Sequence, residues 1–141
     1  MALRTYSFTD VNVIFGIIEL EGFASGDTVV TVVADEDQFV KEVGAKGDII
    51  RTQTNDSSCT ITVSLQQTSP SNAELLTAFN ADRESGAGVA PMIINNREAN
   101  ETLVINNAWI TKYPDYNRGQ NPNSQDWVFQ GDFLTFTIVE V

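Results

Sequence analysis

The 141-residue sequence predicts a mainly β fold, a β-sandwich or β-barrel of about eight to ten strands with one α-helix packed on it. Short segments of alternating apolar and polar residues recur along the chain between turns rich in glycine, asparagine and serine. Only residues 71–82 have the spacing of an amphipathic helix. Because no repeat or linker divides the chain, residues 1–141 are expected to form a single domain.

The first third of the chain is expected to supply an N-terminal arm and two strand segments. Apolar side chains recur at nearly every second position over residues 5–16, which is the period of a strand. In residues 17–23, Glu19 and Glu21 share one face, and Ile18 and Leu20 share the other. Residues 28–34 are β-branched and apolar on both faces, which predicts a central strand.

The middle of the chain predicts a hairpin, a strand and the helix. Residues 38–54 carry two apolar runs around the glycine-bracketed turn 44–47, a β-hairpin pattern. Residues 59–66 alternate without a break, with Cys59 on the apolar side. Ser71 and Glu74 have the spacing of a capping box at the start of the helix. Three side chains form its apolar stripe and, with these two, are expected to be scaffolding: Leu75, Leu76 and Phe79.

The last third returns to strand. Residues 91–94 predict a short strand, and residues 102–113 predict one bent strand or a hairpin broken at Asn106 and Asn107. Residues 114–125 predict a long exposed loop. In the final segment, 126–141, apolar residues face one way while Thr135 and Thr137 face the other.

Composition excludes several classes of function. Nineteen acidic against eight basic residues give a net charge of −11, which disfavours nucleic-acid binding. The absence of histidine removes Ser-His and Cys-His catalysis, and no phosphate-binding glycine motif occurs. A single cysteine excludes an internal disulfide, and neither a signal peptide nor a membrane span is recognisable. We therefore expect no enzyme, no cofactor and no metal.

Two other classes remain as alternatives. A β-sandwich carbohydrate-binding module would display Trp109 and Trp127 for stacking on sugar rings. A small hydrolase would need converging carboxylates, for which Glu19 and Glu21 are a coincidental pair in so acidic a chain. The cluster at 35–37 lacks the spaced ligands of a calcium loop.

Four segments resemble, in the same order along the chain, tail tube proteins of contractile-tail bacteriophages. They are TYSFTDVN at 5–12, GAKGD at 44–48, TITVSLQQTSPSNA at 60–73 and DWVF at 126–129. The resemblance implies a sandwich or barrel with a flanking helix that assembles into stacked hexameric rings. It further implies a virion tail protein, assembled in the host cytoplasm, with sheath protein outside the tube, tape measure protein inside, and DNA passing through without specific binding. The same fold serves the tube of type VI secretion systems.

The resemblance gives particular residues a role in assembly. The arm and the projecting hairpin are expected to make ring-to-ring contacts, because so apolar a hairpin is unsuited to free solution. The candidate contact residues are Tyr6, Phe8, Phe39, Val40, Val43, Lys46, Ile49 and Ile50.

A lumen through which DNA slides should be acidic or small-polar, because a cation on its wall would be repeated in every subunit. The candidate lumen residues come from the polar faces of the strands: Glu19, Glu21, Thr60, Thr62, Ser64, Thr135 and Thr137.

Overall fold

The structure is a computed structural model that describes residues 3 and 5–139. It contains ten strands, one α-helix and a short 3-10 helix in this part of the chain. The elements are η1 (Phe8–Asp10), β1 (Val11–Phe15), β2 (Ile18–Glu19), β3 (Val30–Ala34), β4 (Phe39–Val43), β5 (Ile49–Gln53), β6 (Cys59–Gln66), α1 (Ser71–Ser85), β7 (Ala90–Asn96), β8 (Glu101–Ile110), β9 (Ser124–Gly131) and β10 (Leu134–Ile138). The predicted mainly β fold with one helix is confirmed.

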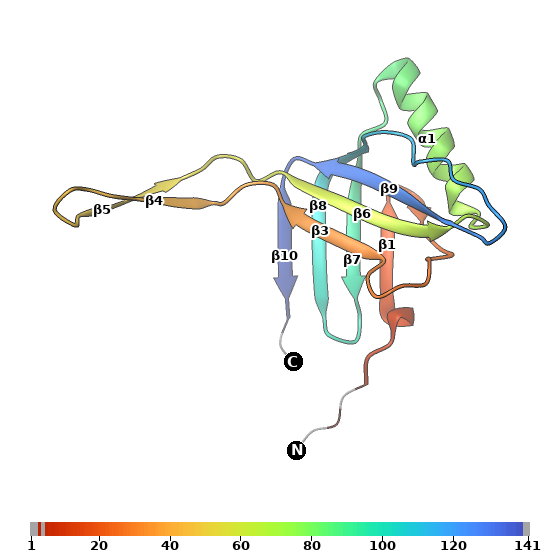
Figure 1. Ribbon diagram of the computed structural model, residues 1–141, viewed down its shortest axis with the longest axis horizontal. Coiled ribbons are helices and arrows are strands. Elements are labelled where there is room, and N and C mark those ends of the chain that lie inside the picture. Colours follow the sequence, from red (N-terminus) through yellow and green to blue (C-terminus); the bar gives the residue numbers. More distant parts are fainter. Residues whose placement is uncertain (1–2, 4, 140–141) are drawn as a thin grey trace.

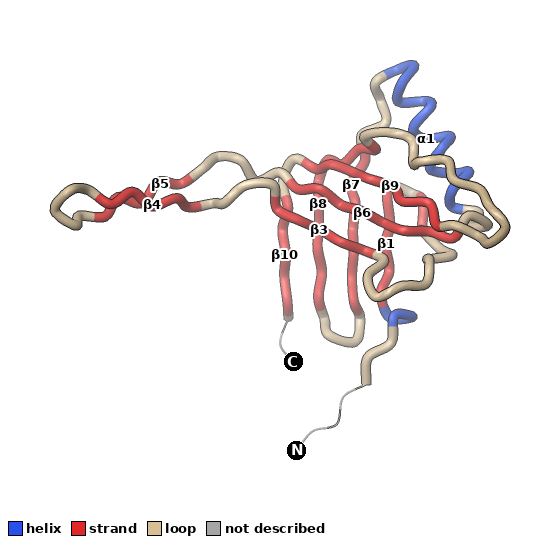
Figure 2. The backbone as a smooth tube through the Cα atoms, viewed as in Figure 1, coloured by secondary structure: helices blue, strands red, loops and turns tan. Residues whose placement is uncertain are grey.

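The strands form two crossing layers (Figure 1). The order β2–β1–β7–β8–β10 makes one layer, and β9–β6–β3 makes the other. Strand β8 belongs to both layers, because its first half pairs with β10 and its second half with β9. Residues 102–110 are thus one strand that changes partner, which answers the choice left open by the sequence. Figure 2 shows the sandwich and, well outside it, the β4–β5 hairpin.

The passage from β9 to β10 depends on close packing and a reciprocal set of hydrogen bonds. A Cβ on Gly131 would lie 2.2 Å from Cγ2 of Ile105, so only glycine lets β9 approach β8 here. The next residue, Asp132, donates its amide to the Asn107 carbonyl, and its Oδ2 accepts from Asn107 Nδ2 at 2.8 Å. These bonds fix the turn between β9 and β10 against β8. The hydrogen bond from the Asn107 side chain is the main reason that the pKa of Asp132 lies below its usual value.

Strand β6 supplies the centre of the core, as its alternation predicts. Cys59, Ile61, Val63 and Leu65 are fully buried, and the residues between them are partly exposed. The strand is paired on both edges, with β9 and with β3. Burial, followed by the charges of Asp35 and Asp132, raises the pKa of the Cys59 thiol, so this residue acts as a small buried apolar side chain.

The prediction of a central strand over residues 28–34 is wrong. Strand β3 pairs only with β6 and forms the edge of its layer. Val33 is 53% exposed on its outer side. Strand β3 therefore has apolar residues on both faces, but its outer face is exposed to solvent in the single subunit.

The helix begins at Ser71, as predicted, but its capping and its end differ from the prediction. Pro70 is the N-cap and makes no side-chain capping bond, so the capping box of Ser71 and Glu74 is not formed. Ser71 is buried, and its Oγ accepts a hydrogen bond from the Glu21 amide at 3.0 Å. The helix continues to Ser85 and stops at Gly86, whose φ of 71° is the left-handed geometry that ends helices.

Candidate assembly surfaces

The hairpin of β4 and β5 is the most exposed element of the molecule. All ten strand residues are exposed, and the hairpin extends away from the sandwich (Figure 1). In its register Val43 lies opposite Ile49, and Lys41 lies opposite Arg51. Opposite residues share a face, so one face has an apolar end at Val43 and Ile49 and a basic middle. The Arg51 guanidinium also lies 4.2 Å from the centre of the Phe39 ring on this face.

The remaining hairpin candidates occupy other positions. Val40 and Ile50 lie on the opposite face of the hairpin, and Lys46 is in its turn. In the N-terminal arm Tyr6 is exposed, whereas Phe8 packs edge-on against Phe23 at a centroid distance of 5.1 Å. Phe8 thus anchors the arm to its own subunit, and of these two candidates Tyr6 is the one left open to a partner. Residues 1, 2 and 4 of the arm lie outside the described residues.

The lumen candidates do not form one surface. Thr135 and Thr137 pair with Val104 and Thr102, on the outer face of the β2–β1–β7–β8–β10 layer. Glu19 pairs with Ile14 on that same face. We call this surface the β10 face. Glu21 lies beyond the end of β2, where its backbone contacts the start of α1.

The other three candidates lie on the opposite side of the sandwich. Thr60, Thr62 and Ser64 point outward from β6, between β3 and β9. Thr60 donates to Asp35 Oδ1 and Ser64 to Asp126 Oδ1, each at 2.7 Å. We call this surface the β6 face. One lumen wall can therefore contain either the β10 face or the β6 face, and not the whole set expected from the sequence.

Basic residues avoid both faces. The strands of the sandwich, β1 to β3 and β6 to β10, contain no lysine or arginine. The cations on strands belong to the hairpin, at Lys41 and Arg51. Either outer face would thus present a wall without attraction for phosphate, apart from cations supplied by loops.

The helix scaffold is smaller than predicted. Leu75 is fully buried and Phe79 is half-buried, with its ring edge-on to Tyr113 at a centroid distance of 4.7 Å. Leu76 is 40% exposed, so its assignment to the buried stripe is wrong, and Glu74 is exposed as well. The helix lies at one end of the sandwich (Figure 1).

A groove beside α1 was not foreseen. It has a volume of about 380 Å³ and is lined largely by apolar and aromatic side chains from α1 and the loop after β8, including Leu76, Tyr113 and Tyr116. In the sequence, Tyr113 and Tyr116 were the residues that could have indicated this groove, since exposed aromatic residues are frequent at contact surfaces.

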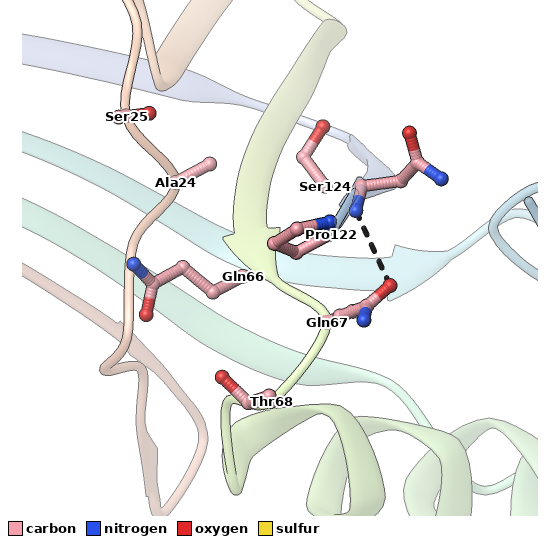
Figure 3. Close-up of a pocket in the computed structure, with 8 residues that line it drawn as sticks. Ala24, Ser25, Gln66, Gln67, Thr68, Pro122 and Ser124 are labelled. Carbon is pink, nitrogen blue, oxygen red and sulfur yellow. Dashed lines mark hydrogen bonds between the residues drawn. The ribbon is translucent and has the colours of Figure 1, made fainter. Parts of the chain in front are cut away.

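The two tryptophans that a carbohydrate-binding module would display are not both at the surface. Trp127 is buried, and its indole N–H donates to Asn72 Oδ1 at 2.9 Å, while Trp109 is half-buried. The two rings therefore form no sugar-stacking platform. A hollow of about 450 Å³ between the 24–25 loop, the end of β6 and residues 122–124 is lined by uncharged side chains (Figure 3). Its one hydrogen bond in this view joins the Asn123 amide to Gln67 Oε1.

Within residues 3 and 5–139, no group of three metal-ligating side chains comes together, and the acidic cluster at 35–37 forms no such group. In the same part of the chain, no helix has the length and apolar character needed to cross a membrane.

Known proteins resemble this chain in sequence and in fold. The structural protein ORF10 of Pseudomonas phage KPP10 is 34% identical over 119 residues, which cover 83% of this chain and 68% of that protein. In fold, the tube-terminating cap of the anti-feeding prophage has a TM-score of 0.70 at 14% identity, covering 99% of this chain and 95% of the cap chain. A chain of the sheath–tube complex of the extracellular contractile injection system PVC has a TM-score of 0.63 at 17% identity, covering 92% and 88%.

The sequence model of the bacteriophage PhiTE tail tube protein matches residues 3–136. This match includes the sandwich, the hairpin and the helix, which are all but the ends of the chain. The chain belongs to the family of the bacteriophage PhiTE tail tube protein.

Proposed function

We propose that this protein assembles into hexameric rings that stack into the inner tube of a contractile phage tail. As a member of a tail tube family it is a structural component of the virion. Sheath protein surrounds the tube, tape measure protein fills it before ejection, and DNA then passes through. The observation that carries the proposal is the family match over residues 3–136, joined to an apolar hairpin whose ten strand residues are all exposed. The sheath–tube complex of a protein with the same fold supports the sheath as a partner.

The β10 face is the better candidate for the lumen wall. Its layer ends in β10 on one side and in the two-residue β2 on the other. Each of these end strands has an unpaired edge, so neighbouring subunits can continue the sheet in both directions. The opposite layer has an open edge only at β3, because β9 is joined to β8 at the corner. A closed ring needs two open edges per subunit, which favours the β10 face.

The chemistry of the β10 face suits a passage for DNA. Asn12 and Asn95 share a hydrogen bond on it, Thr135 and Thr137 add hydroxyl groups, and Glu19 adds a carboxylate. Neutral and acidic groups give phosphate no favourable electrostatic contact. DNA can then slide past many identical rings without being held.

Electron microscopy of the purified protein tests the proposal. We expect rods with a central channel and six-fold rings, with Thr135 and Thr137 on the channel wall and Thr62 outside. Monomers or closed single rings under all solution conditions would contradict tube formation. Rods whose channel is lined by Thr62 would retain the tube and reverse the assignment of the faces.

A charge placed on either face separates the two assignments further. Thr135→Lys adds a cation to every subunit of the proposed wall, and Thr62→Lys adds the same cation to the opposite face. We expect tubes of Thr135→Lys to retain a fluorescent oligonucleotide in their channel at low salt and release it at high salt. Tubes of Thr62→Lys serve as the matched control and should retain no more oligonucleotide inside the channel than the parent.

A further inference from the structure

The groove beside α1 lies between this helix and the loop 111–123 that joins β8 to β9 (Figure 1). On the helix side it is lined by Asn72 and Leu76, which are one turn apart and share a face. On the loop side it is lined by Tyr113 and by Tyr116, whose side chain is 79% exposed. We call this surface the α1 groove.

The two walls of the α1 groove are held by their own hydrogen bonds. The Tyr113 hydroxyl accepts from Arg83 Nη1 and donates to Asn80 Oδ1, which ties the loop to the helix. The Arg118 guanidinium lies 4.2 Å from the centre of the Tyr116 ring, a cation–π contact within the loop. Because these contacts form within the single chain, a ligand meets a largely preformed surface and loses little affinity to ordering it.

The polar groups left over in the α1 groove are hydrogen-bond donors. Gln125 lines the groove and is only 7% exposed, and its Nε2 atom has no hydrogen-bond partner among the described residues. Arg118 also lines the groove and uses one nitrogen on the Asn117 carbonyl, which leaves further N–H groups of its guanidinium. A buried donor without an acceptor is unfavourable, so the groove favours a ligand that supplies acceptors.

Charge around the α1 groove has the opposite sign to that of the whole protein. None of the described residues that line the groove is acidic. The loop 111–123 contains Lys112, Asp115 and Arg118, two basic residues against one acidic, so its net charge is +1 on a chain of net charge −11. Arg83, at the end of α1, adds a further cation beside the loop. The groove is therefore complementary to an anionic ligand with an apolar part.

We propose that the α1 groove binds an acidic peptide segment of another protein, in which an apolar side chain stands next to carboxylates. The apolar side chain packs between Leu76 and Tyr116, a carboxylate accepts from Arg118, and a peptide carbonyl accepts from Gln125. A peptide fits better than a nucleic acid, because the net charge of −11 repels a chain of phosphates. The site goes beyond the proposed tube, since it uses neither the hairpin nor the β10 face.

Equilibrium dialysis with the full-length protein tests the site, whether the protein is present as subunits or as rods. The probe is the fluorescein-labelled, C-terminally amidated peptide Glu-Glu-Leu-Phe-Glu-Glu, and the matched peptide has lysine in place of each glutamate. We expect saturable binding of the acidic peptide, weakened by added salt, and no saturable binding of the lysine peptide. A second acidic probe with benzoylphenylalanine in place of phenylalanine is photo-cross-linked, and mass spectrometry should place the adduct within residues 72–76 or 113–118.

Two variants with matched controls connect binding to the α1 groove. Arg118→Gln removes the guanidinium and should weaken binding of the acidic peptide by about tenfold, the size expected for one charge-assisted hydrogen bond. Its control is Arg97→Gln in the exposed turn after β7, which should bind like the parent. Leu76→Asp places a carboxylate on the apolar wall and should abolish binding. Its control is Ile17→Asp, because Ile17 is fully exposed in the turn between β1 and β2.

Several results would overturn the proposal. Equal binding of the acidic and lysine peptides would mean that the groove is only an apolar patch. Adducts outside the groove, or equal losses in Arg118→Gln and Arg97→Gln, would place the peptide elsewhere. A dissociation constant above about 1 mM for the acidic peptide would leave the groove without this ligand. Saturable binding of a fluorescein-labelled oligothymidylate in place of the peptide would assign the groove to nucleic acid instead.

Discussion

Strand β6 and the hairpin strands β4 and β5 have similar apolar content but opposite environments. Every second residue of β6 is fully buried, whereas Phe39, Val40 and Ile50 of the hairpin are exposed like the rest of its strands. Neither element could be a free strand in water. An apolar strand pattern therefore identifies a surface that must be covered, and it does not say whether the same chain covers that surface.

The hairpin is held at its base and free at its end. The Thr54 amide donates to the Gln38 carbonyl at 2.8 Å, and Gln38 Nε2 donates to the Asp56 carbonyl at the same distance. Two-stranded hairpins alone are only marginally stable. These bonds, and the Arg51 contact with Phe39, direct the hairpin outward without giving it a core.

The largest expected effect comes from charging the hairpin. Ile49→Asp with Ile50→Asp places one carboxylate on each face of the hairpin that is proposed to contact other subunits, so we expect complete loss of rods in electron micrographs. Because both side chains are exposed in the single subunit, the free energy of unfolding of the monomer should change by less than about 1 kcal/mol. Rods of normal length in this variant would remove the hairpin from the assembly interface.

Truncating one phenylalanine in each region compares them directly. Phe129 is fully buried, and Phe129→Ala should lower the free energy of unfolding by about 3–5 kcal/mol, since it leaves a cavity. Phe39→Ala on the hairpin should cost less than about 1 kcal/mol. Urea unfolding of the monomeric protein measures both, and equal losses would mean that the hairpin contributes to the core stability of the single subunit.

The two regions also differ in their tolerance of an added methyl group. Gly131→Ala would force a Cβ against Ile105, and we expect a loss of about 1–3 kcal/mol. Gly44→Ala in the hairpin meets only the Asp48 carbonyl oxygen at 3.6 Å, an ordinary contact, and should leave thermal unfolding nearly unchanged. A neutral Gly131→Ala would show that β8 and β9 can move apart at the corner.

The smallest effect concerns pH. The Asn107 side chain holds the pKa of Asp132 below 3.8 in the folded protein, so the ionised carboxylate stabilises the fold above that pH, and this contribution is lost as pH falls through the folded pKa. Asp132→Asn should therefore lower the urea midpoint more at pH 7 than at pH 3. The exposed turn substitution Asp27→Asn is the control, and an equal change at both pH values would contradict the role of the carboxylate.

The elements whose pattern is local could be predicted from the sequence. The alternation over Cys59–Gln66 predicted a strand with one buried face, and the glycine-bracketed turn at 44–47 predicted the hairpin. The collinear segments that resemble tail tube proteins predicted the family that the match over residues 3–136 confirms. The strand and the hairpin could be predicted because backbone periodicity and turn geometry depend on neighbours along the chain.

The tertiary structure was needed to show which surfaces are buried and which are exposed. It placed β3 at an edge, moved Ser71 from a helix cap to a buried contact with the Glu21 amide, and left Leu76 outside the core. It also separated Thr135 from Thr62 onto opposite faces, although both belong to alternating strands with the same polar pattern. The pleat of a strand gives it two faces, but which face meets the core, a lumen or another subunit depends on the packing of distant strands, and that information is absent from the local sequence.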